Sequence, residues 1–564
     1  MPDVFKAGIP THREDKAKDG QKNSDVKPSE TLPQHIFALP SVLIKKLNPD
    51  SMLVYTPISG RRPSRHLISL LCIGLLLPLL LLSSGCVSLE KNPVTGTTRA
   101  FGYSWQEELQ IGRDADQQIS AQYGLYEDEE LSAYIDELSR EVLEHNHLWR
   151  EGQPQEFRDT EFTFRVLNSD IVNAFALPGG YIYFTRGLLT HMNNEAQLAV
   201  VIGHEIGHVT ARHASQRALQ QQAGQLLLVG GAVAGQELFG VSAQSIMNLG
   251  GTAAQLLFLS YSRSNERESD ALGVEYAAMA GFDASEGSAF FRTLQRLTER
   301  AGGGLPNHLS SHPDPGNREQ RMLQLSEQWR NDGFEQSRRN EARYMEMIEG
   351  TIIGRNPREG YTEGNMFYHP ELRFEYPVPQ GWRVQNEARQ VIMFDENQRG
   401  ISVFAIAANA STARQAVEEF TGQDGINVTS SGSETVNGLS AYRSEATATD
   451  ADGNTLRVLV QAVEHDGNVY RVLNYSSSDD YSDFEEDFNL IVDGFSELTN
   501  TSALNVQPTR IEVVRADRTG PFSSFLPDED VFPQGMDAES FAIMNQVGLE
   551  ETVTRGQRLK LPRR

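Results

Sequence analysis

The chain has 564 residues, of which 39% are hydrophobic and 22% charged, and these ordinary values exclude a mostly disordered chain. The length predicts two to four domains, and the formal net charge of -26 disfavours a nucleic-acid binder, whose footprint is a basic patch. With two cysteines, Cys72 and Cys86, a disulfide scaffold and a four-cysteine zinc site on this chain alone are excluded.

Residues 1–85 form a basic leader of the kind that precedes an exported protein. They carry eleven basic and seven acidic residues, and three arginines precede the uncharged apolar run 67–82. A membrane-spanning helix needs about 20 apolar residues, and Pro78 interrupts this shorter run, so a signal peptide is predicted. Met52 would give a more ordinary leader and is a second candidate for the first residue.

Cys86 follows Ser-Ser-Gly directly after the apolar run. Small residues before a single Cys resemble a bacterial lipoprotein signal, in which Cys86 would be lipidated and become the first residue. The family pattern usually has Leu three places before the Cys, where this chain has Ser83. An uncleaved anchor helix and a simple secretory signal are the alternatives. The residue after the Cys is Val87, whereas the known retention signal at that position is Asp. We therefore expect the lipid in the outer membrane and the protein body in the periplasm.

The region from the leader to residue 350 is predicted to be mainly helical with a few strands. Ser104 and Glu107 form a capping box, which predicts a helix start. Pro178-Gly179-Gly180 separates two short apolar runs, which predicts a strand, a turn and a second strand. In chain order, we expect helices at 104–122 and 129–144, strands at 161–168, 170–177 and 181–185, a long helix at 193–220, and further helices within 266–300 and 317–346.

The composition changes after about residue 350. Short β-rich runs fill 366–477, and Asp452-Gly453 and Asp466-Gly467 lie between such runs as hairpin turns. Helical stretches at 411–421 and 480–497 complete a predicted strand-rich α+β domain. The expected domains are a leader at 1–85, a mainly helical domain at 86–350, the α+β domain at 360–498 and a small C-terminal domain at 503–564.

Residues 204–208 read His-Glu-Ile-Gly-His within an apolar helix. Positions i and i+4 share one face of a helix, so His204 and His208 can bind one ion together, and imidazole suits Zn²⁺. Glu205 lies on the same turn and can reach a water on the metal. A surface helix with two unrelated histidines is the alternative, which the buried character of Val200 to Val209 disfavours.

A catalytic zinc requires a third protein ligand, and Glu266 is the candidate. Glu266 and Asp270 are four residues apart and therefore share one face of a second helix. Glu266 can bind the metal, while Asp270 can accept the free N–H of a ligating histidine and hold its ring.

Four segments resemble a zinc metalloprotease family in the family's order and spacing. The family includes HtpX, BepA, Oma-type proteases and the CAAX prenyl protease, and the resemblance covers residues 104–330, about 40% of the chain. It implies a zincin-type α+β peptidase domain, mainly helical with a small edge-strand sheet, and one zinc ion per chain. The segments are NAFALPGGYIYFTRGLL at 173–189, HEIGHVTARH at 204–213, YSRSNERESDALG at 261–273 and SHPDPGNR at 311–318.

The resemblance also implies roles for single residues. His204, His208 and Glu266 match the zinc ligands, and Glu205 matches the catalytic carboxylate. Glu268 is then not a ligand, and the helical spacing turns it away from the face of Glu266. Ser269 stands where the family usually has Ala, which leaves the ligands unaffected.

Two further parts of the resemblance concern the surroundings of the metal. Tyr181, Ile182 and Tyr183 lie in the strand that pairs with extended substrate in related proteases, with an ordinary core hairpin as the alternative. His312 and Arg318 belong to a segment near the metal. His312 is an inhibitory ligand in some members and could instead stabilise the transition state, and a solvated His in a capping loop is the third possibility.

The apolar stretch 224–238 is too short and too rich in glycine for a membrane span. We expect a lid or plug helix over the active site there, with a plain core helix as the alternative.

The sequence therefore predicts a zinc metalloendopeptidase that acts on protein or peptide substrates in envelope protein quality control. The alternative is an assembly factor or chaperone for envelope proteins, in which residues 360–564 bind an envelope partner and proteolysis is gated or dispensable. An inactive lipoprotein scaffold is a third reading, which the complete set of metal-binding residues weakens. The membrane would be reached through a lipid on Cys86, and no nucleic acid is expected.

Overall fold

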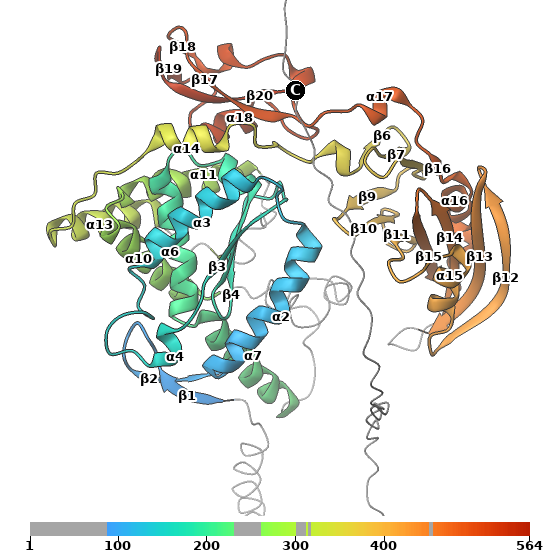
Figure 1. Cartoon of the computed structure of the whole chain (residues 1–564), viewed down its shortest axis with the longest axis horizontal. Coiled ribbons are helices and arrows are strands. Elements are labelled where there is room, and N and C mark those ends of the chain that lie inside the picture. The colour runs from blue at the N-terminus through green and yellow to red at the C-terminus, as the bar shows by residue number, and fades with distance from the viewer. Residues whose placement is uncertain (1–86, 231–260, 301–311, 314–316, 450–454) are drawn as a thin grey trace, which may run out of the picture. The chain divides into compact units, whose positions relative to one another are not determined.

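The computed structural model describes residues 87–230, 261–300, 312–313, 317–449 and 455–564 (Figure 1). Cys86, the leader and the Asp452-Gly453 turn lie outside the described residues, as does most of the expected lid segment 224–238. Among the described helices, none is long and apolar enough to cross a membrane.

The first part of the chain is built mainly from helices, with short strands among them. Its helices α2 and α3 begin where the sequence predicts, and the Ser104–Glu107 capping box is present at the start of α2. In chain order the elements are β1 (Ser88–Lys91), β2 (Thr98–Phe101), α2 (Trp105–Tyr123), α3 (Glu129–Leu143), α4 (Gln155–Arg158), β3 (Thr163–Leu167), β4 (Ala174–Leu177), β5 (Tyr181–Thr185), α5 (Arg186–Thr190), α6 (Glu195–Thr210), α7 (His213–Gly230), α10 (Arg263–Met279), η1 (Ala284–Glu286), α11 (Gly287–Arg300), α13 (Arg318–Asn331) and α14 (Glu341–Ile348).

The small sheet beside α6 has the strand order β3-β5-β4. Strand β5 pairs parallel with β3 and antiparallel with β4, so it is the central strand. The expectation that Tyr181, Ile182 and Tyr183 form an edge strand is therefore wrong, because β3, which precedes the hairpin, pairs with the side of β5 that faces away from β4. Strand β4 has no described neighbour on its outer side and is the edge strand next to the site.

The expected long helix 193–220 is two helices, α6 and α7. Arg212 adopts a left-handed backbone conformation with φ of 61° and breaks the helix. Its guanidinium is buried, donates to Glu108 Oε1 at 2.8 Å and to the Tyr103 carbonyl at 2.8 Å, and pairs with Glu90. These tertiary bonds stabilise a conformation that a non-glycine residue rarely adopts.

The second part of the chain is strand-rich, as predicted, and has its own hydrophobic core. A seven-stranded sheet has the order β12-β13-β14-β15-β11-β10-β9, and a four-stranded sheet has the order β16-β8-β7-β6. Asp466 and Gly467 both have positive φ in the β14–β15 turn, as the sequence predicts. The elements are η2 (Pro357–Glu359), β6 (Tyr361–Glu363), β7 (Met366–His369), β8 (Phe374–Pro377), β9 (Arg383–Asn386), β10 (Gln390–Phe394), β11 (Ile401–Ile406), α15 (Ala413–Thr421), β12 (Ile426–Val436), β13 (Leu439–Thr449), β14 (Thr455–His465), β15 (Asn468–Ser477), α16 (Tyr481–Gly494) and β16 (Ser496–Glu497).

The C-terminal segment shares its core with the helical part of the chain. Phe541, Leu559 and other buried residues of this segment pack in one cluster with residues of α3 and α6. Lys560 is fully buried, and its Nζ donates to the carbonyls of Thr190 and Met192 at 2.7 Å each. The segment contains α17 (Thr501–Leu504), β17 (Arg510–Arg515), β18 (Gly520–Pro521), η3 (Phe522–Phe525), η4 (Glu529–Val531), α18 (Ala538–Met544), β19 (Thr552–Val553) and β20 (Arg558–Arg563).

Candidate metal centre

Helix α6 carries the His-Glu-x-x-His motif and is buried along its whole length. Asn194 caps its start by accepting a hydrogen bond from the backbone N–H of Gln197. His204 and His208 are one turn apart on one face, and their Nε2 atoms lie 3.0 Å from each other. The helix therefore presents two imidazole nitrogens to one point, as the spacing predicts.

Helix α10 packs against α6 at very short range because two glycines face each other. A Cβ added to Gly203 would meet the Gly273 carbonyl at 2.8 Å, and one added to Gly273 would meet the Val200 carbonyl at 2.8 Å. This close approach lets the short side chain of Glu266 reach the histidines. Its Oε2 lies 3.5 Å from His204 Nε2, and its Oε1 lies 3.5 Å from His208 Nε2.

His312 completes a buried group of four side chains, His204, His208, Glu266 and His312, whose ligand atoms all lie within 4.8 Å of one another. His312 Nδ1 lies 3.1 Å from Glu266 Oε1 and 3.5 Å from His204 Nε2. Ligand atoms bound to a tetrahedral zinc at about 2.0–2.1 Å are about 3.3–3.4 Å apart. Five of the six pairs in this group are 3.0–3.5 Å apart, close to that spacing, so the geometry is compatible with one metal ion.

The protonation of the two helix histidines follows from their burial and partners. Burial holds the pKa of His208 well below its usual value, so the ring is neutral, the form that binds a metal. Burial alone would also lower the pKa of His204, but Asp270 and Glu266 raise it to about 9. Burial acts to raise the pKa of Glu266, and His312 and His204 hold it well below its usual range. A metal ion must therefore displace a proton from His204.

Glu205 lies beside this group without being part of it. Its carboxylate is buried, with Oε1 3.7 Å from His312 Nε2, and its Oε2 has no hydrogen-bond partner among the described residues. Burial raises the pKa of this carboxyl. A buried carboxylate with one free oxygen and a raised pKa has the properties of a group that accepts and returns a proton.

Asp270 and Arg318 support the site from behind His204. Asp270 Oδ1 lies 3.1 Å from His204 Nδ1, as expected for a carboxylate that holds a ligating histidine. Arg318 Nη2 donates to the same carboxylate at 2.5 Å, and its guanidinium covers the Phe291 ring at 3.9 Å. The structure therefore places Arg318 against Asp270, with its Nη2 also 3.6 Å from Glu266 Oε2.

Three neighbours of the metal-binding group were not predicted to lie there. The Tyr261 ring stacks on His208 with centroids 4.0 Å apart. His213 Nδ1 lies 3.1 Å from His208 Nδ1, and His213 Nε2 lies 3.2 Å from Glu268 Oε2. Helical spacing does turn Glu268 away from Glu266, but the break at Arg212 brings His213 between Glu268 and His208. The signal was present in the sequence as the His and Tyr that flank the two motifs.

The edge strand β4 also contacts the site. His312 Nε2 donates to the Ala174 carbonyl at 3.2 Å when its proton is on that nitrogen. On the central strand, Tyr183 is fully buried and its hydroxyl donates to Asp116 at 2.7 Å, so this residue supports the sheet.

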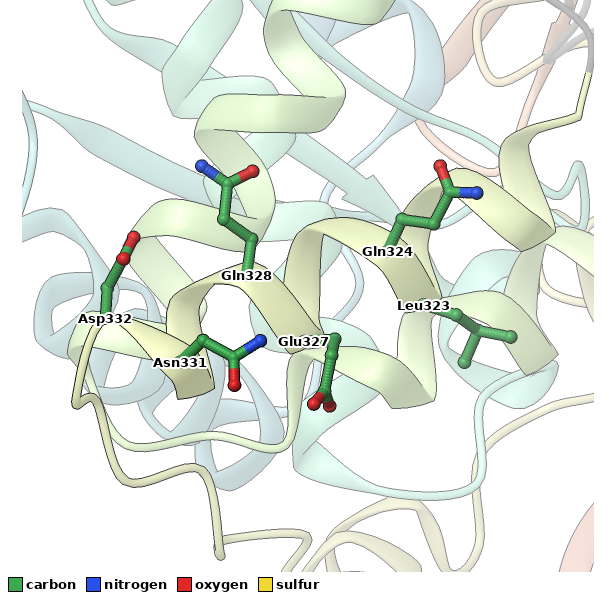
Figure 2. Close-up of a pocket in the computed structure, with 6 residues that line it drawn as sticks. All are labelled: Leu323, Gln324, Glu327, Gln328, Asn331 and Asp332. Carbon is green, nitrogen blue, oxygen red and sulfur yellow. The ribbon is translucent and has the colours of Figure 1, made fainter.

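A surface hollow along α13 is distinct from the metal-binding group. Figure 2 shows that it is lined by side chains of this one helix and its end. It contains none of the four metal-binding residues, and carboxylates, amides and one leucine form its lining. The residues are Leu323, Gln324, Glu327, Gln328, Asn331 and Asp332.

A His-Glu-x-x-His helix joined to a glutamate of a second helix defines the gluzincin class of metallopeptidase sites. Residues 140–326 match Peptidase family M48, so the chain contains a domain of this family. That range holds every member of the metal-binding group as well as Glu205.

The chain is similar to several curated proteins over part of its length. It is 31% identical over 238 residues to the beta-barrel assembly-enhancing protease of Escherichia coli, covering 41% of this chain and 46% of that protein. It is 33% identical over 161 residues to the mitochondrial metalloendopeptidase OMA1 of Arabidopsis thaliana, covering 28% of this chain and 31% of that protein. The chain thus spans less than half of the length of these relatives.

Proposed function

We propose that this protein is a zinc-dependent endopeptidase that hydrolyses peptide bonds of protein substrates in the bacterial cell envelope. The observation that carries the proposal is the buried set of four metal-binding side chains with the free carboxylate oxygen of Glu205 beside it. The M48 match and the relatives named as beta-barrel assembly-enhancing proteases support a role in envelope protein quality control.

His204, His208 and Glu266 would hold one zinc ion per chain, since two imidazoles and a carboxylate suit this metal. When bound, zinc would act as a Lewis acid that lowers the pKa of a water molecule, so that this water can lose a proton and attack a carbonyl near neutral pH. Glu205 accepts the proton of the attacking water at Oε2 and returns it to the nitrogen of the leaving amine. The raised pKa of Glu205 suits both steps, because the group must be a base first and an acid afterwards.

The peptidase proposal is tested by removing and restoring the metal. Full-length protein in detergent should cleave casein, lose this activity when zinc is removed with a chelator, and regain it when zinc is added back. The loss should approach completeness, because the carboxylate of Glu205 alone does not supply an activated nucleophile. Cleavage that survives complete metal removal would contradict the proposal. Zinc-loaded protein that cleaves nothing would favour the assembly-factor alternative.

Substrate would bind as an extended strand along β4. The edge strand of a sheet offers unpaired backbone groups that a peptide can pair with. Among the described strands, β4 is the edge of the β3-β5-β4 sheet, and its Ala174 carbonyl is already in contact with His312. The substrate strand is therefore assigned to Ala174–Leu177 instead of Tyr181–Thr185.

His312 would act as an inhibitory fourth ligand. Its Nδ1 faces Glu266, and its Nε2 faces the backbone of β4, so one side chain occupies both the open metal position and the substrate strand. His312→Ala should therefore raise kcat/KM, by about tenfold if displacing the imidazole costs about 1.4 kcal/mol. Steady-state cleavage of a fluorogenic peptide at equal zinc loading measures this. A slower enzyme would instead assign His312 to transition-state stabilisation, and an unchanged rate would assign it to neither role.

An envelope location would follow from a lipid on Cys86, with the protein body in the periplasm and the lipid in the outer membrane. Cys86→Ser should abolish labelling with a radioactive fatty acid and release the protein from membranes. Fractionation after high-salt and carbonate washing measures the release. A variant that stays with the membrane would show that the apolar run 67–82 is an anchor.

Residues 360–564 would provide a surface for an envelope protein partner. The α+β domain within them has a core of its own, which peptide hydrolysis at the metal does not require. Assembly activity without proteolysis is the less favoured function, because the four metal-binding side chains and Glu205 lie together in one buried group.

A further inference from the structure

Each of the two α6 histidines has a carboxylate of helix α10 behind it. For His204 the carboxylate is Asp270, in direct contact at 3.1 Å. For His208 the contact is indirect: His213 lies between the ligand and Glu268. Glu266, Glu268 and Asp270 thus stand at alternate positions on one helix, with the first facing the metal-binding group and the other two behind its histidines.

In the hydrogen-bonded chain His208–His213–Glu268, each histidine donates to the next residue. The Nε2 of His208 faces His204 and Glu266 and is the nitrogen available to a metal, so the ring proton is on Nδ1. This N–H points to His213 Nδ1 at 3.1 Å, which must accept. His213 then carries its proton on Nε2 and donates it to Glu268 Oε2 at 3.2 Å.

This chain of hydrogen bonds begins in the buried metal-binding group and ends near the protein surface. The His213 side chain is fully buried, whereas the Glu268 side chain is 26% exposed, so the chain of bonds leads from the metal-binding group to a carboxylate near the surface. The Ser269 hydroxyl lies 3.2 Å from His213 Nδ1 and can donate to the same nitrogen, which is therefore the acceptor. The His213 ring also lies edge-on to the His208 ring, with centroids 5.0 Å apart and planes at 77°.

We propose that His213 and Glu268 are positioning residues of the metal centre, which fix the tautomer and ring orientation of the ligand His208 and contribute to zinc affinity. The inference rests on the proposed zinc site and extends it to two residues outside the ligand set. It also assigns a role to Glu268, which helical spacing alone placed away from the metal.

The test measures zinc affinity of the full-length protein by competition with a chelating dye. His213→Ala should weaken zinc binding by about 10–100-fold, the usual effect of removing a hydrogen-bond partner of a ligand. His213→Asn should recover most of the affinity, because the Asn side-chain oxygen can accept from His208 Nδ1. Glu268→Ala should weaken binding about tenfold, and Glu268→Gln should weaken it less, since its amide oxygen still accepts from His213.

Two further measurements separate positioning from general stability. The melting temperature of the metal-free Glu268 variants should stay close to that of the metal-free wild type, because this side chain is 26% exposed. In every variant the increase caused by zinc should shrink. In cobalt-substituted protein, His213→Ala should shift the visible absorption bands. Glu275→Ala is the matched control, because Glu275 is also on α10 and lies 3.8 Å from a buried histidine, His147, which is hydrogen-bonded to Tyr276 and not to a metal ligand.

The outcomes distinguish this inference from the proposed function. Wild-type protein that binds no zinc would overturn the metal site itself. Wild type that binds zinc, with His213→Ala and Glu268→Ala binding equally well, would overturn the positioning role alone. If His213→Ala does not fold, the zinc affinity of Glu268→Ala, at its partly exposed position, tests the positioning role instead.

Discussion

Replacing Glu205 with Gln should lower kcat for peptide cleavage by about 10²–10⁴-fold, the range lost when a general base is removed. The amide has the size and shape of the carboxylate but cannot accept the proton of the attacking water. Zinc content should stay at the wild-type level, because Glu205 is not among the four metal-binding side chains. Steady-state kinetics and metal analysis on the same preparation measure both.

Glu195→Gln is the matched control for this variant. Glu195 is on the same helix and is also fully buried, but it accepts hydrogen bonds from Tyr134 and Asn340 away from the metal-binding group. Its variant should lose stability and keep kcat. A Glu205→Gln enzyme with more than a tenth of the wild-type kcat would show that another group takes the proton.

The double variant His204→Ala, His208→Ala should contain no zinc and show no detectable cleavage. Both side chains supply the nitrogens that face each other at 3.0 Å, and the remaining Glu266 and His312 leave too few ligands for a stable site. Inductively coupled plasma mass spectrometry on protein purified without added metal measures the content.

Glu266→Gln extends the same comparison, since a neutral amide is a poor substitute for a carboxylate on zinc. This variant should bind zinc more weakly than wild type, whereas the Glu205→Gln variant should not. Full zinc retention in the double histidine variant would contradict the ligand assignment. A Glu266→Gln variant with unchanged affinity would show that His312 or another group is the third ligand.

Features that depend on neighbouring residues could be predicted from the sequence. The Ser104–Glu107 capping box starts α2, and the Asp466-Gly467 pair forms the hairpin turn between β14 and β15. Both signals are local, because they arise from the conformational preferences of a few consecutive residues. The apolar helix with His204 and His208 on one face is of the same kind.

Features that depend on distant residues could not be predicted. Periodicity continues α6 into one long helix, but buried bonds from Arg212 to Glu108 and Tyr103 break it. From the sequence, either strand of the 174–185 hairpin could have been the edge strand of the sheet. The pairing of β3 with β5 makes β5 the central strand and leaves β4 at the edge. The buried residues of the C-terminal segment share the core that contains α6, which the composition of this segment does not indicate.

The sequence by itself determined the kinds of side chain at the site and their order: two histidines one turn apart, a glutamate between them and an acidic helix further along. Tertiary structure alone decided what surrounds them. It brings His312 onto Glu266, 46 residues away, and onto Ala174, 138 residues away, and it places His213 between His208 and Glu268. The physical reason is that helical periodicity encodes which residues share a face, whereas the partner of that face is chosen by packing, here by the close approach of Gly203 and Gly273.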